Sequence, residues 1–401
     1  MDIPAITQMD VAGKTLVVRA DLNVPMNGKE VSDATRITRF AAGMTPLLAQ
    51  GARLVILTHF GRPKGEMNPE LSVDKLRPAL SEALGVPVKF SDVSAGPTVQ
   101  IHVQGLKDGE VLLCENVRFN PGEEKNDPAL AEEFAKLGDI YVNDAFSCAH
   151  RAHASTEGVA KLMPAVAGPL MMEEITALQN ALEAPESPAI AIVGGAKVST
   201  KIAVLKNLVG KLDGVIIGGG MANTFLFADG APMGTSLHEA DQLETVREIR
   251  ALAAASGCKL YLPKDVACSP DFREGAPVTH MPADACPDNQ MILDAGPEAT
   301  EDFKIALSGA KTILWNGPLG AFEIPPFDRA TVELARHAAQ MTQAGKCVSV
   351  AGGGDTVAAL IHAGVDQNFT YVSSAGGAFL EWLEGKTLPG IAALMRSEKA
   401  A

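Results

Sequence analysis

Short runs of apolar residues, many of them β-branched, alternate along the chain with longer segments in which apolar residues recur every three or four positions. The short runs are typical of strands buried on both faces, and the longer segments of amphipathic helices. The runs cover residues 15–18, 54–57, 111–113, 140–142, 189–193, 215–217, 312–314 and 347–350, and the helical spacings cover 35–50, 75–84, 200–208, 243–255 and 331–340. This alternation predicts an α/β fold with mostly parallel sheets.

The alternation is interrupted once, near the middle of the chain. Four prolines, at positions 164, 169, 185 and 188, flank an acidic stretch with helical spacing at residues 171–182. Because the strand–helix pattern starts again on each side, we predict two α/β lobes joined by a central helix, with an active site in the cleft between the lobes. One large sheet crossed by a surface helix is the alternative. The predicted domains are residues 1–170, a linking helix at 171–185, and residues 186–386.

Charge limits the kinds of partner that the chain can have. Lys and Arg number 34 and Asp and Glu number 48, which gives a formal net charge of −14. Such a chain has no general attraction to nucleic acid or to anionic lipid, so an anionic ligand needs a local cluster of basic groups. The six cysteines show no metal-binding or paired spacing. With no visible signal peptide and no apolar run of membrane-spanning length, we expect a soluble, cytoplasmic protein.

Basic and amide side chains follow the apolar runs of the first half. They are Arg19, Asp21 and Asn23, then His59 and Arg62, then Asn116 and Arg118, then Asn143, Asp144, His150, Arg151 and His153, with Arg36 and Arg39 near the start of the first helical segment. A single such arginine is usually a solvated surface group. Parallel strands end at one edge of a sheet, however, so these guanidinium groups are expected to converge on a small phosphorylated, carboxylate-bearing ligand. No third ligand accompanies His150 and His153, so a metal is not expected there.

Glycines follow the apolar runs of the second half, at 194–195, 218–220, 317, 352–354 and 376–377. Glycine lets a backbone approach a ligand closely, and a helix start offers free N–H groups, so these turns predict a nucleotide site. The P-loop, protein-kinase and dinucleotide fingerprints are absent. Lys197 and Lys201 are expected on one face at the start of a helix near Ser199, where two cations are unfavourable unless an anion binds between them. A solvated lysine pair is the alternative.

Asp355 directly follows three glycines. A carboxylate at such a turn can hold a divalent cation that bridges phosphate groups, since Mg²⁺ often takes only one or two protein carboxylates. An ordinary helix N-cap is the alternative, and the two roles are compatible.

Together these motifs resemble phosphoglycerate kinases, in the same order and over about residues 10–390. The matching segments are LVVRADLNVP at 16–25, HFGRP at 59–63, ENVRF at 115–119, DAF at 144–146, HRAH at 150–153, GGAKV at 194–198, GGGMA at 218–222, WNGP at 315–318 and GGGDT at 352–356. One departure is Ser147-Cys148, where a Gly-Thr pair is more usual. It affects the expected geometry of the loop before Arg151, but no motif residue is lost.

The resemblance implies a monomeric glycolytic enzyme with two Rossmann-like lobes and a C-terminal tail, residues 387–401, that returns to the first lobe. The implied reaction is reversible phosphoryl transfer between 1,3-bisphosphoglycerate and ADP, giving 3-phosphoglycerate and ATP with Mg²⁺. The residues implied for 3-phosphoglycerate are Asp21, Asn23, Arg36, His59, Arg62, Arg118 and Arg151. Those implied for the nucleotide are Lys197, Lys201, Gly219, Asn316, Glu323, Gly352, Gly353, Gly354, Asp355 and Thr356, with Glu323 at the ribose and Asp355 at Mg²⁺.

The implied acceptor is a carboxylate that is ionised at neutral pH, so no general base is required. We expect Arg36 and Lys197 to hold the oxygens of the transferring group, Lys201 and Mg²⁺ to hold the nucleotide phosphates, and the lobes to close about the central helix. Two other interpretations remain open. One is a two-lobed kinase or ligase that acts on a different acidic metabolite, and the other is an anion-binding module without catalysis.

Overall fold

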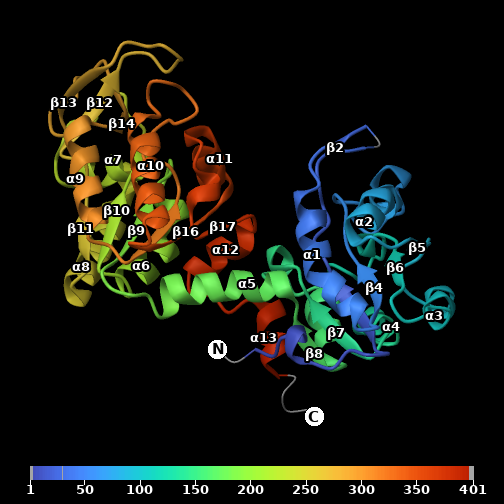
Figure 1. The fold of residues 1–401 in the computed structure, drawn as a ribbon. Helices are drawn as coiled ribbons and strands as arrows, with labels where there is room; N and C mark the ends of the chain where they lie inside the picture. The colour runs from blue at the N-terminus through green and yellow to red at the C-terminus, as the bar shows by residue number, and fades with distance from the viewer. Residues whose placement is uncertain (1–2, 29, 397–401) are drawn as a thin grey trace. The chain divides into compact units, whose positions relative to one another are not determined.

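The computed structural model describes residues 3–28 and 30–396. The chain forms two compact units, shown in Figure 1: the first runs to Ile175 and resumes at Thr387, and the second is Thr176–Lys386. Their boundary falls inside α5 (Pro169–Leu178), within the stretch that we predicted as the linking helix. The predicted first domain and tail also contain residues 1–2, 29 and 397–401, which lie outside the described residues.

A six-stranded sheet forms the centre of the first unit, in the order β5-β6-β4-β1-β7-β8, and every neighbouring pair is parallel. Its side chains are mostly buried because helices cover the sheet, and this explains the uninterrupted apolar runs in the sequence. The strands are β1 (Thr15–Arg19), β4 (Arg53–Leu57), β5 (Val88–Ser91), β6 (Val111–Cys114), β7 (Ile140–Asn143) and β8 (Ala165–Ala167), with a separate hairpin of β2 (Met26–Asn27) and β3 (Glu30–Val31).

Helices of the first unit pack apolar side chains against this sheet. Phe40 and Met44 of α1 lie in one core cluster with Leu80 of α2 and with side chains of β1 and β4. The C-terminal helix α13 contacts β8 and buries Leu394. The helices are α1 (Thr35–Ala49), α2 (Arg77–Leu84), α3 (Pro97–Gln104), α4 (Pro128–Ala135) and α13 (Pro389–Arg396).

The second unit contains another six-stranded parallel sheet, in the order β11-β10-β9-β15-β16-β17. Its strands are β9 (Ala189–Val193), β10 (Gly214–Ile217), β11 (Lys259–Tyr261), β15 (Thr312–Asn316), β16 (Val348–Gly352) and β17 (Tyr371–Ser373). Its helices are α6 (Ile202–Val209), α7 (Gly219–Ala228), α8 (Leu243–Ser256), α9 (Pro297–Ser308), α10 (Arg329–Gln343), α11 (Gly354–Ala363) and α12 (Gly376–Leu383).

A second sheet in the second unit did not emerge from the sequence pattern. It is antiparallel, with β12 (Asp265–Ser269) between β13 (Thr279–Pro282) and β14 (Met291–Ala295). Strand β13 is largely exposed, so it has no apolar run to mark it. Each of the predicted eight runs lies in a strand or overlaps one, and the α/β prediction is confirmed. The single-sheet alternative was wrong, because the two parallel sheets are separate.

Strand order reverses at one place in each parallel sheet. In the first unit the chain extends the sheet from β1 on the β4 side and later adds β7 on the other side; in the second it extends from β9 through β10 and later adds β15. Ligands of open α/β sheets bind outside the carboxyl ends of the strands at such switch points. The residues that follow β1 and β7, and those that follow β9 and β15, are therefore the first places to look for a site.

Helix α9 offers a matched test of where the second unit is stabilised. Phe303 is 1% exposed in the core cluster, and Ile305 on the same helix is 64% exposed. We expect Phe303→Ala to lower the free energy of unfolding by about 3–5 kcal/mol, because it removes buried area and leaves a cavity. Ile305→Ala is expected to change it by less than about 0.5 kcal/mol. Urea unfolding of both variants measures this, and equal effects would contradict the assigned packing.

Candidate functional site

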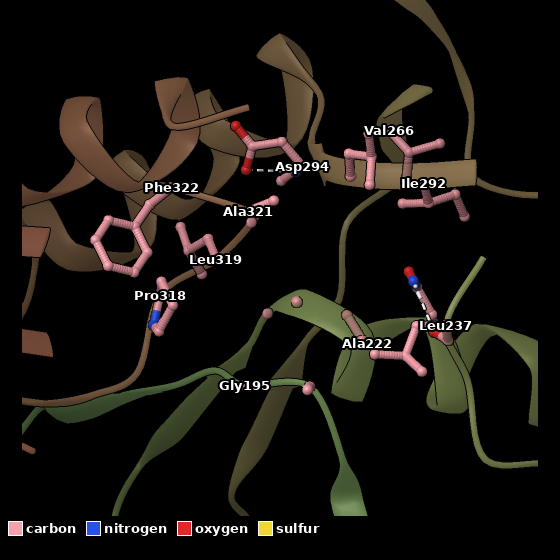
Figure 2. A pocket seen from close by; sticks show the side chains of 18 of the residues that line it. Gly195, Ala222, Leu237, Val266, Ile292, Asp294, Pro318, Leu319, Ala321 and Phe322 are labelled. Carbon is pink, nitrogen blue, oxygen red and sulfur yellow. Dashed lines mark hydrogen bonds between the residues drawn. The ribbon is translucent and has the colours of Figure 1, made fainter. Parts of the chain in front are cut away.

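A cavity of about 570 Å³ lies in the second unit, beside the carboxyl ends of β9, β10 and β15. Figure 2 shows Pro318, Leu319 and Phe322 on one side of it and Val266 and Ile292 on another. Most of the lining is apolar side chain or glycine backbone. Such a surface suits a flat aromatic group such as a nucleobase.

Three turns that contain glycine form the wall of this cavity that faces the sheet. Glycine is needed in them because their backbones lie too close together to leave room for side chains. A Cβ at Gly194 would lie 1.7 Å from the carbonyl oxygen of Pro318. Gly219, which begins α7, has a φ of +66°, and a Cβ there would lie 2.7 Å from the carbonyl oxygen of Gly195. The glycines predicted here for phosphate contact are thus also required by the packing of the turns on one another.

The turn from β16 into α11 has the features that the sequence predicted. Gly352 ends the strand, Gly353 is the N-cap with a φ of +99°, and Gly354 begins the helix. Thr356 accepts a hydrogen bond through Oγ1 from the N–H of Gly317 at 2.7 Å, which ties this turn to the end of β15. Asp355 is exposed in the first turn of α11 and lines the cavity. Since Gly353 occupies the N-cap, Asp355 does not take that alternative role.

The helix that we expected to start near Ser199, with Lys197 and Lys201 on one face at its N-terminal end, starts later. A 3₁₀ turn, Val198–Thr200, separates them, and α6 begins only at Ile202. Lys197 is exposed, and its ammonium makes no ion pair within residues 3–28 and 30–396. The two lysines therefore have different environments, even though they are four positions apart.

Lys201 is held by three acceptors at the end of the sheet. Its Nζ donates to the carbonyl oxygens of Gly194 at 2.7 Å and Asn316 at 3.0 Å, and to Asn316 Oδ1 at 2.7 Å. Burial lowers the pKa of this ammonium to about 8, although Asp355 acts in the opposite direction. All three N–H donors are in use, so contact with a phosphate requires Lys201 to exchange one of these acceptors.

Asn316 ends β15 and Glu323 lies in the segment that follows it, and the two side chains have different environments. Asn316 is buried and donates from Nδ2 to the carbonyl of Gly352 at 2.8 Å, so it joins β15 to β16. Glu323 is exposed and lines the cavity.

Sequence reasoning missed Asp294, a buried residue of the cavity wall. Its carboxylate accepts a hydrogen bond from the N–H of Ala330 at 2.9 Å and so holds the start of α10. Burial raises the pKa of Asp294, and no pattern in the sequence marked it.

In the first unit, Asp21 joins Arg36 to the end of β1. Arg36 lies in the first turn of α1, and its Nη1 is 2.7 Å from Asp21 Oδ2 and 3.1 Å from the carbonyl oxygen of Asn23. Ser147 also donates to Asp21, at 2.5 Å. Asn23 Oδ1 accepts the N–H of Gly61 at 3.2 Å, which connects the loops after β1 and β4. These residues are brought together as predicted from the strand ends.

The other basic residues of this edge differ in how they are held. Arg118 is buried; it donates to the carbonyl of Gly61 at 2.9 Å and lies 3.4 Å from Glu124. Arg151 donates from Nε to His150 Nε2 at 3.1 Å. Arg62 is exposed and makes no ion pair with any residue that the structure describes.

His59 is buried beside these arginines, and burial together with Arg19, Arg118 and Arg151 lowers its pKa. Arg19 itself was noted at a strand end but not assigned to a site. The apolar run before it gave no sign that its side chain is completely buried.

No group of three or more His, Cys, Asp or Glu side chains suited to a metal ion occurs in the described part of the chain. A divalent cation held mainly by phosphate oxygens needs only one or two carboxylates from the protein. Asp355 is exposed at the cavity beside the glycine turn, so the residues present fit such an ion. Across the same described ranges, no helix is long and apolar enough to cross a membrane.

The family model described as phosphoglycerate kinase matches residues 6–386. This chain belongs to the phosphoglycerate kinase family. The chain is 56% identical over 400 residues to the phosphoglycerate kinase of Jannaschia sp. (strain CCS1), covering 100% of both chains. It is 56% identical over 382 residues to that of Methylobacterium radiotolerans, covering 95% of this chain and 96% of the relative.

Solved structures agree with this assignment. The structure of phosphoglycerate kinase from Coxiella burnetii superposes with a TM-score of 0.92 at 41% identity, and covers 100% of both chains. That from Pyrococcus horikoshii gives a TM-score of 0.78 at 29% identity, again over 100% of both chains. The fold is thus the two-lobed fold of the phosphoglycerate kinase family, and the protein is a kinase of glycolysis that binds a nucleotide.

The environment of Lys201 predicts a proton uptake on nucleotide binding. With a pKa of about 8 in the unliganded protein, the ammonium is about half deprotonated at pH 8. A bound polyphosphate favours the charged form and raises this pKa, so ADP binding should take up about half a proton at pH 8, where the terminal phosphate of ADP is already ionised. Calorimetry in two buffers of different ionisation enthalpy measures the uptake. Lys201→Arg should abolish it; an unchanged uptake would assign the proton elsewhere.

Proposed function

We propose that this chain transfers a phosphoryl group reversibly between 1,3-bisphosphoglycerate and ADP, with the sugar acid bound at the first unit and the nucleotide at the second. The observation that supports it most directly is that the two switch points carry different kinds of chemical group. Arginines and a histidine gather near the ends of β1, β4, β6 and β7, and a cavity lined by glycine and apolar groups lies at the ends of β9 and β15.

For the nucleotide, the apolar part of the cavity accommodates the base, and Glu323 at its rim is proposed to accept hydrogen bonds from the ribose hydroxyl groups. The phosphates are proposed to lie at Gly352–Gly354 and the first turn of α11, where helix N–H groups and the helix dipole favour negative charge. Gly219 allows the neighbouring turn to approach equally closely. Lys201 and Asn316 support this arrangement by holding the ends of β9, β15 and β16 together.

The proposed Mg²⁺ would be held by Asp355 and by phosphate oxygens. When bound, the ion supplies positive charge that neutralises the phosphate groups. Asp355 would contribute one carboxylate from an exposed position, and it has no hydrogen-bond or ion-pair partner to displace among the residues that the structure describes.

For the sugar acid, Arg62, Arg118 and Arg151 are proposed to neutralise its negative groups and His59 to contact it. Asn23 and Asp21 are proposed to position the loops around it. Arg36 is paired with Asp21 at 2.7 Å. If Arg36 also holds an oxygen of the transferring group, it must turn part of its guanidinium away from that carboxylate. Five N–H donors make this compatible with keeping one contact.

The chemistry needs charge neutralisation rather than proton removal. The carboxylate of 3-phosphoglycerate is ionised at neutral pH, so it requires no base to become a nucleophile. Arg36 from the first unit and Lys197 from the second are proposed to hold the equatorial oxygens of the transferring group. Cations placed in advance for such developing charge contribute several kcal/mol to lowering a barrier.

Lys197 provides the most direct test of this assignment. Lys197→Ala should lower kcat by about 10²–10³-fold and leave the affinity for ADP nearly unchanged, because the interaction is proposed to matter mainly in the transition state. Lys206→Ala is the matched control, since Lys206 on α6 pairs with Glu248 on the exposed surface. A coupled assay of ATP-dependent 3-phosphoglycerate turnover measures both variants. Near-normal kcat for Lys197→Ala would remove Lys197 from this role, and Arg36→Ala tests its partner in the same way.

Direct transfer also requires the two substrates to meet, so we infer that the units approach each other when both are bound. The radius of gyration from small-angle scattering should decrease with 3-phosphoglycerate and a non-hydrolysable ATP analogue together, and less with either alone. An unchanged radius in the presence of both would contradict closure.

A kinase that acts on a different acidic metabolite is the second candidate, because arginines alone would also bind other phosphorylated acids. Comparing 3-phosphoglycerate with other phosphorylated carboxylates in the same assay distinguishes the two. An anion-binding module would bind both ligands without turnover. The cytoplasmic location and the monomeric state stay predictions from the sequence.

A further inference from the structure

The guanidinium group of Arg19 is completely buried beside His59 in the first unit. Arg19 is the last residue of β1, and its side chain is 0% exposed. Its Nε donates to Ser155 Oγ at 2.8 Å, and its Nη1 donates to the carbonyl oxygen of Ala20 at 2.5 Å. These two bonds fix the plane of the group and leave Nη2 at 3.2 Å from His59 Nδ1.

Ser155, which accepts the hydrogen bond from Arg19, is itself held by buried partners. Ser155 donates from its backbone N and from Oγ to Glu123, at 3.0 and 2.6 Å, and Glu123 is 0% exposed. The hydroxyl of Tyr141 donates to the carbonyl of Ser155 at 2.9 Å. Burial raises the pKa of Glu123, while Arg19 and Ser155 lower it. A buried cation needs such a partner, so Glu123, Ser155 and Arg19 form one connected network that ends at His59.

The chemistry of arginine decides which nitrogen of His59 carries a proton. A guanidinium has only donors and stays charged in proteins, so the nitrogen facing Arg19 Nη2 must be an acceptor. Nδ1 of His59 is therefore unprotonated, and the neutral ring carries its proton on Nε2. Within the described residues, the hydrogen-bond contacts of the His59 ring are made at Nδ1, so the N–H at Nε2 remains available to a ligand.

The surroundings of His59 oppose a second proton from every side. The groups that face the ring are Arg19 on β1, Arg118 on the turn Val117–Phe119, Arg151 and His153 on the loop after β7, and Cys148 Sγ at 4.0 Å from Nδ1. The first four lower the pKa of His59, as does burial itself. At neutral pH the His59 ring is thus an uncharged hydrogen-bond donor with its N–H at a fixed position. The neighbouring arginines supply positive charge, which attracts an anion with less dependence on direction.

We propose that Arg19 is a positioning residue that holds His59 as a neutral Nε2–H donor for the anion bound at the first unit. This inference rests on the proposed function, in which His59 contacts 3-phosphoglycerate, whereas Arg19 acts only through His59. The consequence is that the contribution of His59 to binding does not vary near pH 6–7, where an ordinary histidine changes its charge.

Nitrogen NMR of the unliganded wild-type protein tests the tautomer without any substrate. The His59 ring should show an unprotonated Nδ1 and a protonated Nε2, unchanged from about pH 5.5 to about pH 8.5. Assignment comes from the signals that disappear in His59→Gln. A proton on Nδ1, or a titration near pH 6.5, would overturn the proposal whether or not the protein folds with Arg19 replaced.

Two substitutions of His59 test the direction of the donor. The amide of Gln can place an N–H near the Nε2 position, whereas that of Asn reaches only the Nδ1 position. We expect His59→Gln to keep the KM for 3-phosphoglycerate within about 3-fold and His59→Asn to raise it about 10- to 100-fold, with kcat less affected in both. Equal KM values for the two variants would overturn the directional role. A wild-type tautomer as stated, with no shift of the His59 signals on adding 3-phosphoglycerate, would instead contradict the proposed function.

Substituting Arg19 completes the test. Arg19→Met should let the His59 ring exchange between its two neutral tautomers, because Nδ1 loses its fixed donor, while burial, Arg118 and Arg151 still keep the pKa of the ring low. Arg19→Met combined with Glu123→Gln avoids an unpaired buried carboxylate if the single variant is unstable. Cys148→Ala is the control: its thiol lies 3.7 Å from Arg19 Nη2 but cannot fix the tautomer, so the NMR pattern should not change. An unchanged pattern in a folded Arg19 variant would overturn the proposal.

Discussion

Cations that bind an anion together repel one another when the anion is absent, and this constraint shapes both units. The chain has a net charge of −14, yet it concentrates positive groups at two sheet edges. Most of these groups have a partner within the protein: Arg36 pairs with Asp21, Arg118 donates to a carbonyl, and Lys201 is held by three oxygens. Lys197 and Arg62 are exposed, where water screens their charge. If these paired groups bind substrate as proposed, each must exchange an internal partner for a substrate oxygen.

Parallel sheets explain why so much of the site could be predicted from the sequence. The carboxyl ends of parallel strands meet at one edge, so residues such as Asp21, His59 and Arg118, far apart in the chain, could be expected together once the strands were recognised. The glycine turns were equally readable, because an uninterrupted apolar run followed by glycines is a local pattern. Gly194 and Gly219 show that the physical reason is close contact between backbones.

What the sequence could not provide is the set of buried polar partners. Arg19, Glu123 and Ser155 are distant in the chain, and nothing local distinguishes them from surface residues. Asp294 holds α10 from a strand of the small antiparallel sheet, which itself lacked a clear apolar pattern. The environment of Lys201 was missed for a related reason: its acceptors are the carbonyl of Gly194 and the distant residue Asn316, and a 3₁₀ turn precedes α6. Such details depend on tertiary packing.

The discontinuous first unit has a consequence for how the chain is made. Helix α13 buries Ile391 and Leu394 against elements formed by residues more than 200 positions earlier. These side chains leave the ribosome only after the whole of Thr176–Lys386 has left the exit tunnel. The second unit is contiguous and can acquire its native contacts during synthesis, whereas the first leaves an apolar patch uncovered until α13 has emerged.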